Sequence, residues 1–159
     1  MHGIVSIGGR RSPAAMRMAR VLTAYLVLLL AACGGARPPQ TMDALPVFPE
    51  ASELPAGANP LAEQVSEAML AAIGANLSAE VRLLQLPAGS DWASVEQFYR
   101  EELADTDWQI AEELTSAEGS LTTAGWQRGA LAGEQVLMLG YLPASPDAAP
   151  VLIVALFSE

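Results

Sequence analysis

The chain has 159 residues, of which 18 are acidic and 8 are basic, so its formal net charge at neutral pH is −10. All the basic residues are arginines; four lie before residue 33, and every acidic residue lies after it, so residues 33–159 carry four positive against 18 negative charges, or −14. Such an acidic body repels the phosphates of nucleic acid and anionic lipid headgroups. We therefore expect no nucleic-acid partner, and we interpret the charge as an aid to solubility.

Three reactive side-chain types are absent from the body of the chain. The only histidine is His2, the only cysteine is Cys33, and lysine does not occur. After residue 33 the sequence therefore offers no imidazole base, no second thiol and no amine for a Schiff base. Zinc sites built from cysteine and histidine, iron–sulfur clusters and histidine-ligated haem are excluded in the same way. We expect a protein that is not an enzyme and that holds no cofactor.

The N-terminal region has the pattern of an export signal. A short basic stretch, Met16–Arg20, precedes an uncharged apolar run from Val21 to Ala32. A helix of about twelve residues reaches about 18 Å, which is short of a hydrocarbon core roughly 30 Å thick. The pattern therefore favours a signal peptide over a transmembrane helix. We predict that residues 1–32 are this signal peptide, for which Met16 or Met18 would also serve as a start.

Small residues run into the only cysteine and give the sequence Leu30-Ala31-Ala32-Cys33. This segment resembles the lipobox of bacterial lipoprotein precursors. The resemblance implies a diacylglyceryl group on the Cys33 thiol, cleavage between Ala32 and Cys33, and an exported protein held on a membrane by its lipid. In a bacterium with two membranes, Gly34 resembles the outer-membrane sorting signal; otherwise the protein would lie on the outer face of the cell membrane. A plain signal peptide with an incidental cysteine is the alternative.

Residues 33–58 are rich in proline and glycine, a composition that is typical of a tether. Proline-rich segments favour the extended polyproline II conformation at ~3.1 Å per residue, so about 25 residues could reach about 75 Å. Val47 and Phe48 are more apolar than a free linker requires. We therefore expect these two side chains to dock on the domain, and the mobile part of the tether to end near Thr41.

Residues 59–159 are predicted to form one small globular domain, since roughly 100 residues can bury one core but not two. Asn59 and Pro60 are a favourable start for a helix, with asparagine as the N-cap and proline in the first helical position. Apolar residues then recur every four positions and predict a buried stripe on this helix: Leu61, Val65, Met69 and Ile73.

A second helix is predicted after Ser90 and Asp91, which are both suited to cap it. Its apolar residues fall on one face of the helix: Trp92, Val95, Phe98, Tyr99 and Leu103. Glu96 and Arg100 are spaced to form an ion pair on the other face.

Several apolar runs predict β-strands at 81–86, 108–114, 121–128, 134–142 and 151–157. The last run is apolar at every position, which indicates a central strand that is buried on both faces. Together the elements predict an α+β fold, with two helices packed on one face of a mainly antiparallel sheet of about five strands.

Carboxylates are the main chemical groups left for a site. The neighbours Glu101–Glu102 and Glu112–Glu113 are poorly placed to act as pairs, because adjacent residues point in different directions. Asp105 and Asp107 lie in a predicted turn and are weak candidates for calcium ligands. Aspartates in turns more often cap helices and form the turn itself.

The tryptophans allow two interpretations. Trp92, Trp108 and Trp126 could form an exposed platform that stacks on sugars, or they could fill the core of a small domain. A tryptophan buries a large apolar area, so we expect core packing. Gly125 and Gln127 flank Trp126, which leaves the stacking alternative open at this position.

The helix carrying Phe98-Tyr99-Arg100, followed by Trp108, resembles the short, proline-tethered domains of uncharacterised bacterial lipoproteins. We therefore expect a lipid-anchored cell-envelope protein that contacts the membrane through Cys33 and binds or assembles with another envelope protein. The alternative is a small carboxylate-dependent hydrolase that acts on envelope glycan. Such an enzyme would need two carboxylates that converge in a concave site.

Overall fold

The structure, a computed structural model, describes residues 38–73, 77–118, 121–130, 133–146 and 148–159. The predicted signal peptide, its cleavage site after Ala32 and the lipidation site Cys33 lie outside the described residues. None of the helices in the described part is long and apolar enough to span a bilayer.

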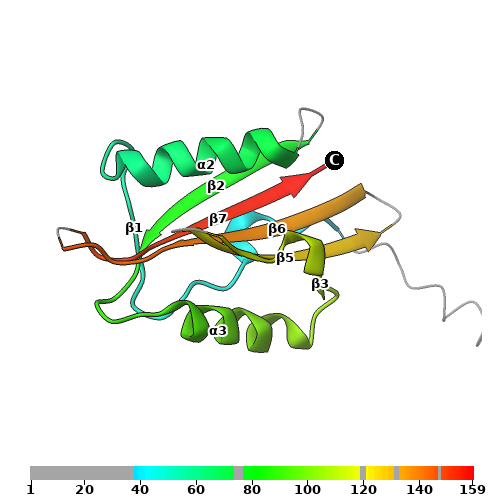
Figure 1. The fold of residues 1–159 in the computed structure, drawn as a ribbon. Coiled ribbons are helices and arrows are strands. Elements are labelled where there is room, and N and C mark those ends of the chain that lie inside the picture. The colour runs from blue at the N-terminus through cyan, green and yellow to red at the C-terminus, as the bar shows by residue number, and fades with distance from the viewer. Residues whose placement is uncertain (1–37, 74–76, 119–120, 131–132, 147) are drawn as a thin grey trace, which may run out of the picture. The chain divides into compact units, whose positions relative to one another are not determined.

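An antiparallel sheet of seven strands, as far as the chain is described, forms the centre of the domain (Figure 1). Its strand order is β1-β2-β7-β6-β5-β3, and β4 also pairs with β5. The strands are β1 (Ser52–Glu53), β2 (Ser78–Gln85), β3 (Gln109–Ile110), β4 (Ser116–Glu118), β5 (Leu121–Ala130), β6 (Gly133–Leu142) and β7 (Val151–Ser158). The predicted α+β class and antiparallel sheet are confirmed. The strand count is higher than expected because the short strands β1 and β4 carry no clear apolar pattern.

Four helical segments accompany this sheet in the described residues: the 3₁₀ turn η1 (Met42–Ala44), α2 (Pro60–Ile73), α3 (Trp92–Ala104) and the 3₁₀ turn η2 (Glu112–Leu114). The strand expected over 108–114 is thus only the two-residue β3 followed by η2.

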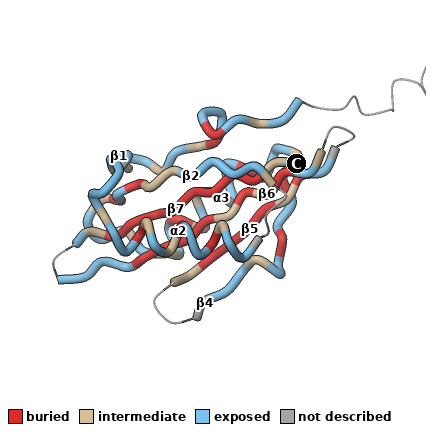
Figure 2. Tube along the Cα trace, turned by 90° about the horizontal axis from the view of Figure 1, so that it is seen from above, coloured by how far each residue is buried: buried red, intermediate tan, exposed pale blue. Residues whose placement is uncertain are grey.

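Strand β7 is the central strand, as its apolar sequence predicts. It pairs with β2 on one side and β6 on the other. Every residue from 151 to 157 is buried, and β7 is red along most of its length in Figure 2. Because successive residues of a strand point to opposite faces, β7 requires cover on both sides of the sheet.

The two α-helices provide this cover from opposite faces (Figure 1). Leu152 and Val154 of β7 belong to the cluster that includes Tyr99 of α3, whereas Ile153 belongs to the cluster that includes Met69 of α2. The expectation that both helices pack on one face is therefore wrong. The physical reason is the apolar character of β7 itself, which would leave one face in water if both helices shared the other.

Helix α2 starts as predicted, and its predicted apolar stripe is confirmed in part. The Oδ1 atom of Asn59 accepts a hydrogen bond of 3.0 Å from the Ala62 N–H, which completes the expected cap. Val65 and Met69 of the stripe pack in the cluster on the α2 face of the sheet, and the side chain of Ile73 lies outside the described residues. Leu61, the first residue of the predicted stripe, is 61% exposed, whereas Ala62 and Ser66 are buried. The small side chains of Ala62 and Ser66 thus lie between the helix and the sheet. A leucine at either position would hold the helix farther from the sheet.

Helix α3 matches its prediction closely. The Oδ1 atom of Asp91 accepts a hydrogen bond of 2.8 Å from the Ser94 N–H, and this bond lowers the pKa of the Asp91 carboxyl. Glu96 and Arg100 form the expected ion pair, with a separation of 2.6 Å. The predicted apolar face is buried at Val95, Tyr99 and Leu103 and partly buried at Trp92 and Phe98.

The Tyr99 hydroxyl is the one fully buried side-chain oxygen or nitrogen of the described residues that lacks a hydrogen-bond partner. Burial raises the pKa of this phenol well above its usual value, so it stays protonated under all ordinary conditions.

Residues 38–51, here called the N-terminal strap, pack on the face of the sheet that α3 covers. Met42 and Leu45 are buried in the same cluster as α3, and Phe48 lies edge-on to Phe98 with 5.4 Å between the ring centroids. The expected docking of Phe48 is confirmed, whereas Val47 is 47% exposed. Burial of each such side chain contributes about 1.5–3 kcal/mol, which is enough to hold a short segment.

The strap moves the start of the folded unit towards the N-terminus. The compact unit spans residues 37–159, and β1 pairs with β2 at Ser52 and Glu53. Residues 38–58 of the expected tether are therefore part of the domain, and the boundary expected at residue 59 is too late. Proline and glycine in this stretch are typical of a linker, but its apolar residues Met42 and Leu45 are buried in the core.

Two glycines test how tightly the α2 face of the sheet is packed. A Cβ atom added at Gly125 would lie 2.5 Å from Cβ of Leu114, and η2 is held there because Thr123 donates a hydrogen bond to the Leu114 carbonyl. We expect Gly125→Ala to lower the free energy of unfolding by about 2 kcal/mol in urea denaturation.

The matched control is Gly140→Ala, whose added Cβ would lie 2.8 Å from the Met69 sulfur. The end of a methionine side chain can move aside, so this variant should cost less than about 1 kcal/mol. A larger loss for Gly140→Ala than for Gly125→Ala would contradict this description of the packing.

Candidate functional site

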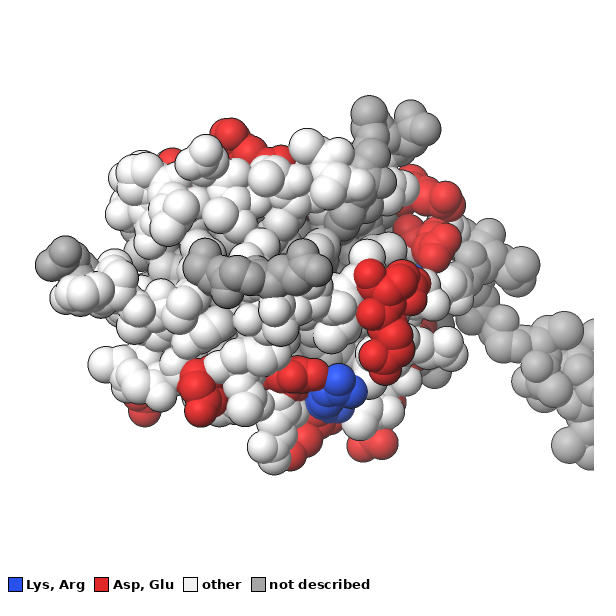
Figure 3. Space-filling view, viewed as in Figure 1, with Lys and Arg blue, Asp and Glu red and all other residues white. Residues whose placement is uncertain are grey.

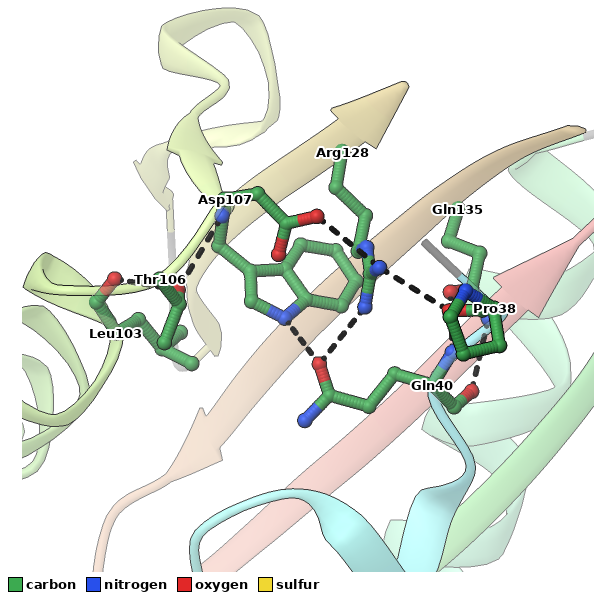
Figure 4. A network of polar contacts seen from close by, with 8 residues as sticks. Pro38, Gln40, Leu103, Thr106, Asp107, Arg128 and Gln135 are labelled. Atoms are coloured by element: carbon green, nitrogen blue, oxygen red, sulfur yellow. Dashed lines mark hydrogen bonds and ion pairs between the residues drawn. The ribbon is translucent and has the colours of Figure 1, made fainter. Parts of the chain in front are cut away.

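The most connected polar cluster of the domain lies where the strap meets the sheet (Figure 4). Arg128 of β5 and Gln135 of β6 are opposite each other in the strand register. Asp107 and Trp108 precede β3, and Gln40 belongs to the strap. These five residues are here called the latch.

Arg128 is the centre of the latch. Its guanidinium forms an ion pair of 3.0 Å with Asp107 and donates hydrogen bonds to Oε1 of Gln40 (3.1 Å) and to the carbonyl of Pro38 (3.2 Å). The guanidinium carbon also lies 5.6 Å from the centroid of the Trp108 ring, within the range of a cation–π contact. Arginine is well suited to this position because its planar fork can reach several acceptors at once.

Gln40 is bonded through both its side chain and its backbone. Its Oε1 accepts a hydrogen bond of 2.7 Å from the Trp108 indole N–H, in addition to the bond from Arg128. The Gln40 N–H donates to Oε1 of Gln135 (2.7 Å), and Nε2 of Gln135 donates to the Gln40 carbonyl (2.9 Å). The Gln135 amide thus binds the strap backbone as a neighbouring strand would.

A second basic residue also contacts the strap. Arg82 of β2 forms an ion pair of 2.6 Å with Asp43 and lies 3.8 Å from Glu53 of β1. The Asp43 side chain is 90% exposed, so this pair adds at most about 1 kcal/mol. Of the described arginines, Arg82 and Arg128 therefore both hold the strap. On the face of the domain that Figure 3 shows, acidic side chains exceed basic ones.

The predicted carboxylate candidates do not converge with one another in the contacts that the structure gives. Asp107 is in the latch, and Asp105 is exposed at the C-cap of α3. Glu101 accepts a hydrogen bond from Gln97, Glu102 is exposed on α3, and Glu112 and Glu113 are exposed in η2. Within the described ranges, no group of three or more histidine, cysteine, aspartate or glutamate residues could hold a metal ion.

The tryptophans pack as core residues, in agreement with the sequence-based expectation. Trp108 and Trp126 are buried, and Trp92 is partly buried against the same cluster. The Trp92 ring lies 6.0 Å from the ring of Tyr141, whose hydroxyl donates to the Ser90 carbonyl. In this structure the three rings therefore do not form an exposed platform.

Two open pockets lie at opposite ends of the sheet. One has a volume of about 400 Å³ and borders the latch, between Pro39 and Arg128. The other has a volume of about 220 Å³ and lies beside Asn59, Gln85 and Ala148. Neither combines converging carboxylates with a deep cavity, and the latch is therefore the candidate functional site of the described residues.

Sequence reasoning missed Gln40, Arg128 and Gln135 as members of a site. One signal was available, because Arg128 follows the buried Trp126 by two residues and therefore shares its face of β5. A charged residue on a buried face requires a partner. The sequence does not show that the partner is a glutamine 88 positions earlier.

The chain matches no protein-family model, and comparisons with curated proteins and with solved structures return no significant match.

Proposed function

We propose that the protein is a lipid-anchored domain of the bacterial cell envelope that binds or assembles with another envelope protein and has no catalytic role. The lipid would be carried by Cys33 after cleavage behind Ala32. In a bacterium with two membranes the location would be the outer membrane; otherwise it would be the outer face of the cell membrane.

The observation that carries this proposal is the way the chain enters the fold. Pro38 and Gln40, shortly after the lipobox-like cysteine, are fixed to the sheet by Arg128 and Gln135. A domain that is held through its N-terminal end needs that end to be firmly attached. The latch supplies hydrogen bonds to the backbone of the segment that would transmit the load from the anchor.

Replacing the cysteine tests the anchor. We expect Cys33→Ala to leave the membrane fraction or to remain uncleaved, because alanine has no thiol to accept the diacylglyceryl group. The measurement is membrane fractionation together with the mass of the isolated protein. Normal processing and full membrane retention of Cys33→Ala would contradict the proposal.

The partner is tested by crosslinking the lipidated protein in intact cells and identifying what co-purifies. A binding or assembly role predicts a defined envelope protein that is recovered with the wild type and lost with Cys33→Ala. Recovery of the same set of proteins with the wild type and with Cys33→Ala would show that the anchor does not place the domain beside its partner.

A further inference from the structure

We infer that the latch end of the domain faces the membrane at short range and that the opposite end of the sheet points away from it. This inference rests on the proposed lipid anchor at Cys33. It concerns which surface of the domain is available for assembly, which the anchor alone does not determine.

The chain between the lipid and the fold is short. Residue 33 is five positions before Pro38, the first residue that the latch binds. At no more than about 3.6 Å per residue, this stretch spans at most about 18 Å. A free tether over the whole of residues 33–58 would instead allow about 75 Å. The docked strap therefore limits how far the domain can move from the bilayer.

The ends of three strands lie at the latch end of the sheet. The amide of Gln135, near the start of β6, bonds both Gln40 and the Ser158 hydroxyl at the end of β7. The Ser78 hydroxyl, at the start of β2, donates to the Ser158 carbonyl. The starts of β2 and β6 and the end of β7 thus meet beside the strap, on the side of the C-terminus in Figure 1.

The latch end also carries negative charge. Glu134 is exposed, and it is joined to Glu159 by hydrogen bonds that involve both backbones. Two carboxylates at this position oppose adsorption to anionic headgroups. The lipid, rather than adhesion of the protein surface, would therefore set the distance between the domain and the membrane.

The far end carries the loops that connect β6 to β7 and β2 to α3. They are joined by the hydrogen bond from the Leu86 N–H to the Pro150 carbonyl and by the bond from the Tyr141 hydroxyl to the Ser90 carbonyl. The ten residues of β6 separate the two ends by about 30 Å at ~3.4 Å per residue. The pocket beside Asn59 and Ala148 lies at this far end, on the side that would point away from the membrane.

The chain is well suited to a direct test, because its only native cysteine would be occupied by lipid. An introduced cysteine is then the single free thiol, so one fluorophore can be placed at Glu134→Cys and, in a matched variant, at Ala144→Cys. Both positions are exposed, and they lie near opposite ends of β6. The lipidated, labelled proteins are reconstituted into vesicles that carry a nitroxide quencher on the lipid headgroups.

The ~30 Å between the two ends predicts that quenching of the Glu134→Cys label is at least about twofold stronger than that of the Ala144→Cys label. Insertion of ten glycine and serine residues between Ala36 and Arg37 should reduce this difference, since such a linker adds about 18 Å of average reach. Equal quenching at the two positions, or stronger quenching at Ala144→Cys, would overturn the inference.

The outcomes also separate this inference from the proposed function. Lipidated protein with equal quenching overturns the orientation alone. Protein that lacks lipid on Cys33 and does not float with the vesicles overturns both.

Discussion

Replacing Leu45 with alanine is expected to lower the free energy of unfolding by about 3 kcal/mol. Leu45 is 5% exposed and packs in the cluster that α3 and the sheet share. Removing a buried leucine side chain loses its transfer free energy and leaves a cavity that the surroundings fill only partly. The measurement is urea denaturation of the purified protein.

Val47→Ala is the matched control because it removes a similar apolar side chain from the same strap at a position that is 47% exposed. Its effect should stay within about 0.5 kcal/mol. If residues 38–58 were a solvated tether, both substitutions would be nearly neutral. That result would contradict the docking of the strap.

Arg128→Met is expected to lower the free energy of unfolding by about 2–3 kcal/mol and to make the strap sensitive to proteases. The substitution keeps an apolar side chain but removes the donors to Pro38 and Gln40, the ion pair with Asp107 and the cation–π contact of the guanidinium. Each hydrogen bond to a charged group contributes about 1.5–3 kcal/mol to the free energy of unfolding. The Asp107 side chain is 31% exposed, so water offsets part of the stabilisation that is lost with its ion pair.

The control for this charge is Arg100→Met. Arg100 forms an ion pair with Glu96 on the outer face of α3 and is 41% exposed, so its loss should cost no more than about 0.5 kcal/mol. Protease cleavage within residues 38–51 should increase in Arg128→Met and remain unchanged in Arg100→Met. Equal stability and equal cleavage of the two variants would show that the latch does not hold the strap.

The parts of the fold that local patterns determine were predictable. Asn59 with Pro60, and Asp91 with the apolar face that follows it, define the starts of α2 and α3. The continuous apolar run of β7 identified the central strand. The same run also implied two covered faces, and applying that consequence would have placed the two helices on opposite sides of the sheet.

The strap and the latch depend on contacts that local patterns do not contain. The hydrogen bonds between Gln40 and Gln135 join residues 95 positions apart, and two glutamines carry no signal of such pairing. Proline and glycine correctly indicate that regular secondary structure is scarce in residues 38–58, the part of this stretch that the structure describes. They do not show whether the segment is solvated or docked, because that depends on whether Met42 and Leu45 find an apolar surface.

Amide hydrogen exchange over residues 38–54 tests the docking of the strap most directly. The Gln40 N–H is bonded to the Gln135 side chain, and the Leu54 N–H is bonded to the Leu83 carbonyl of β2. A docked strap predicts that both amides exchange far more slowly than in an unstructured chain, and that Arg128→Met removes the protection at Gln40 first. Exchange of Gln40 at the rate of a free peptide in the wild-type protein would contradict the docked strap and the short connection to the membrane that follows from it.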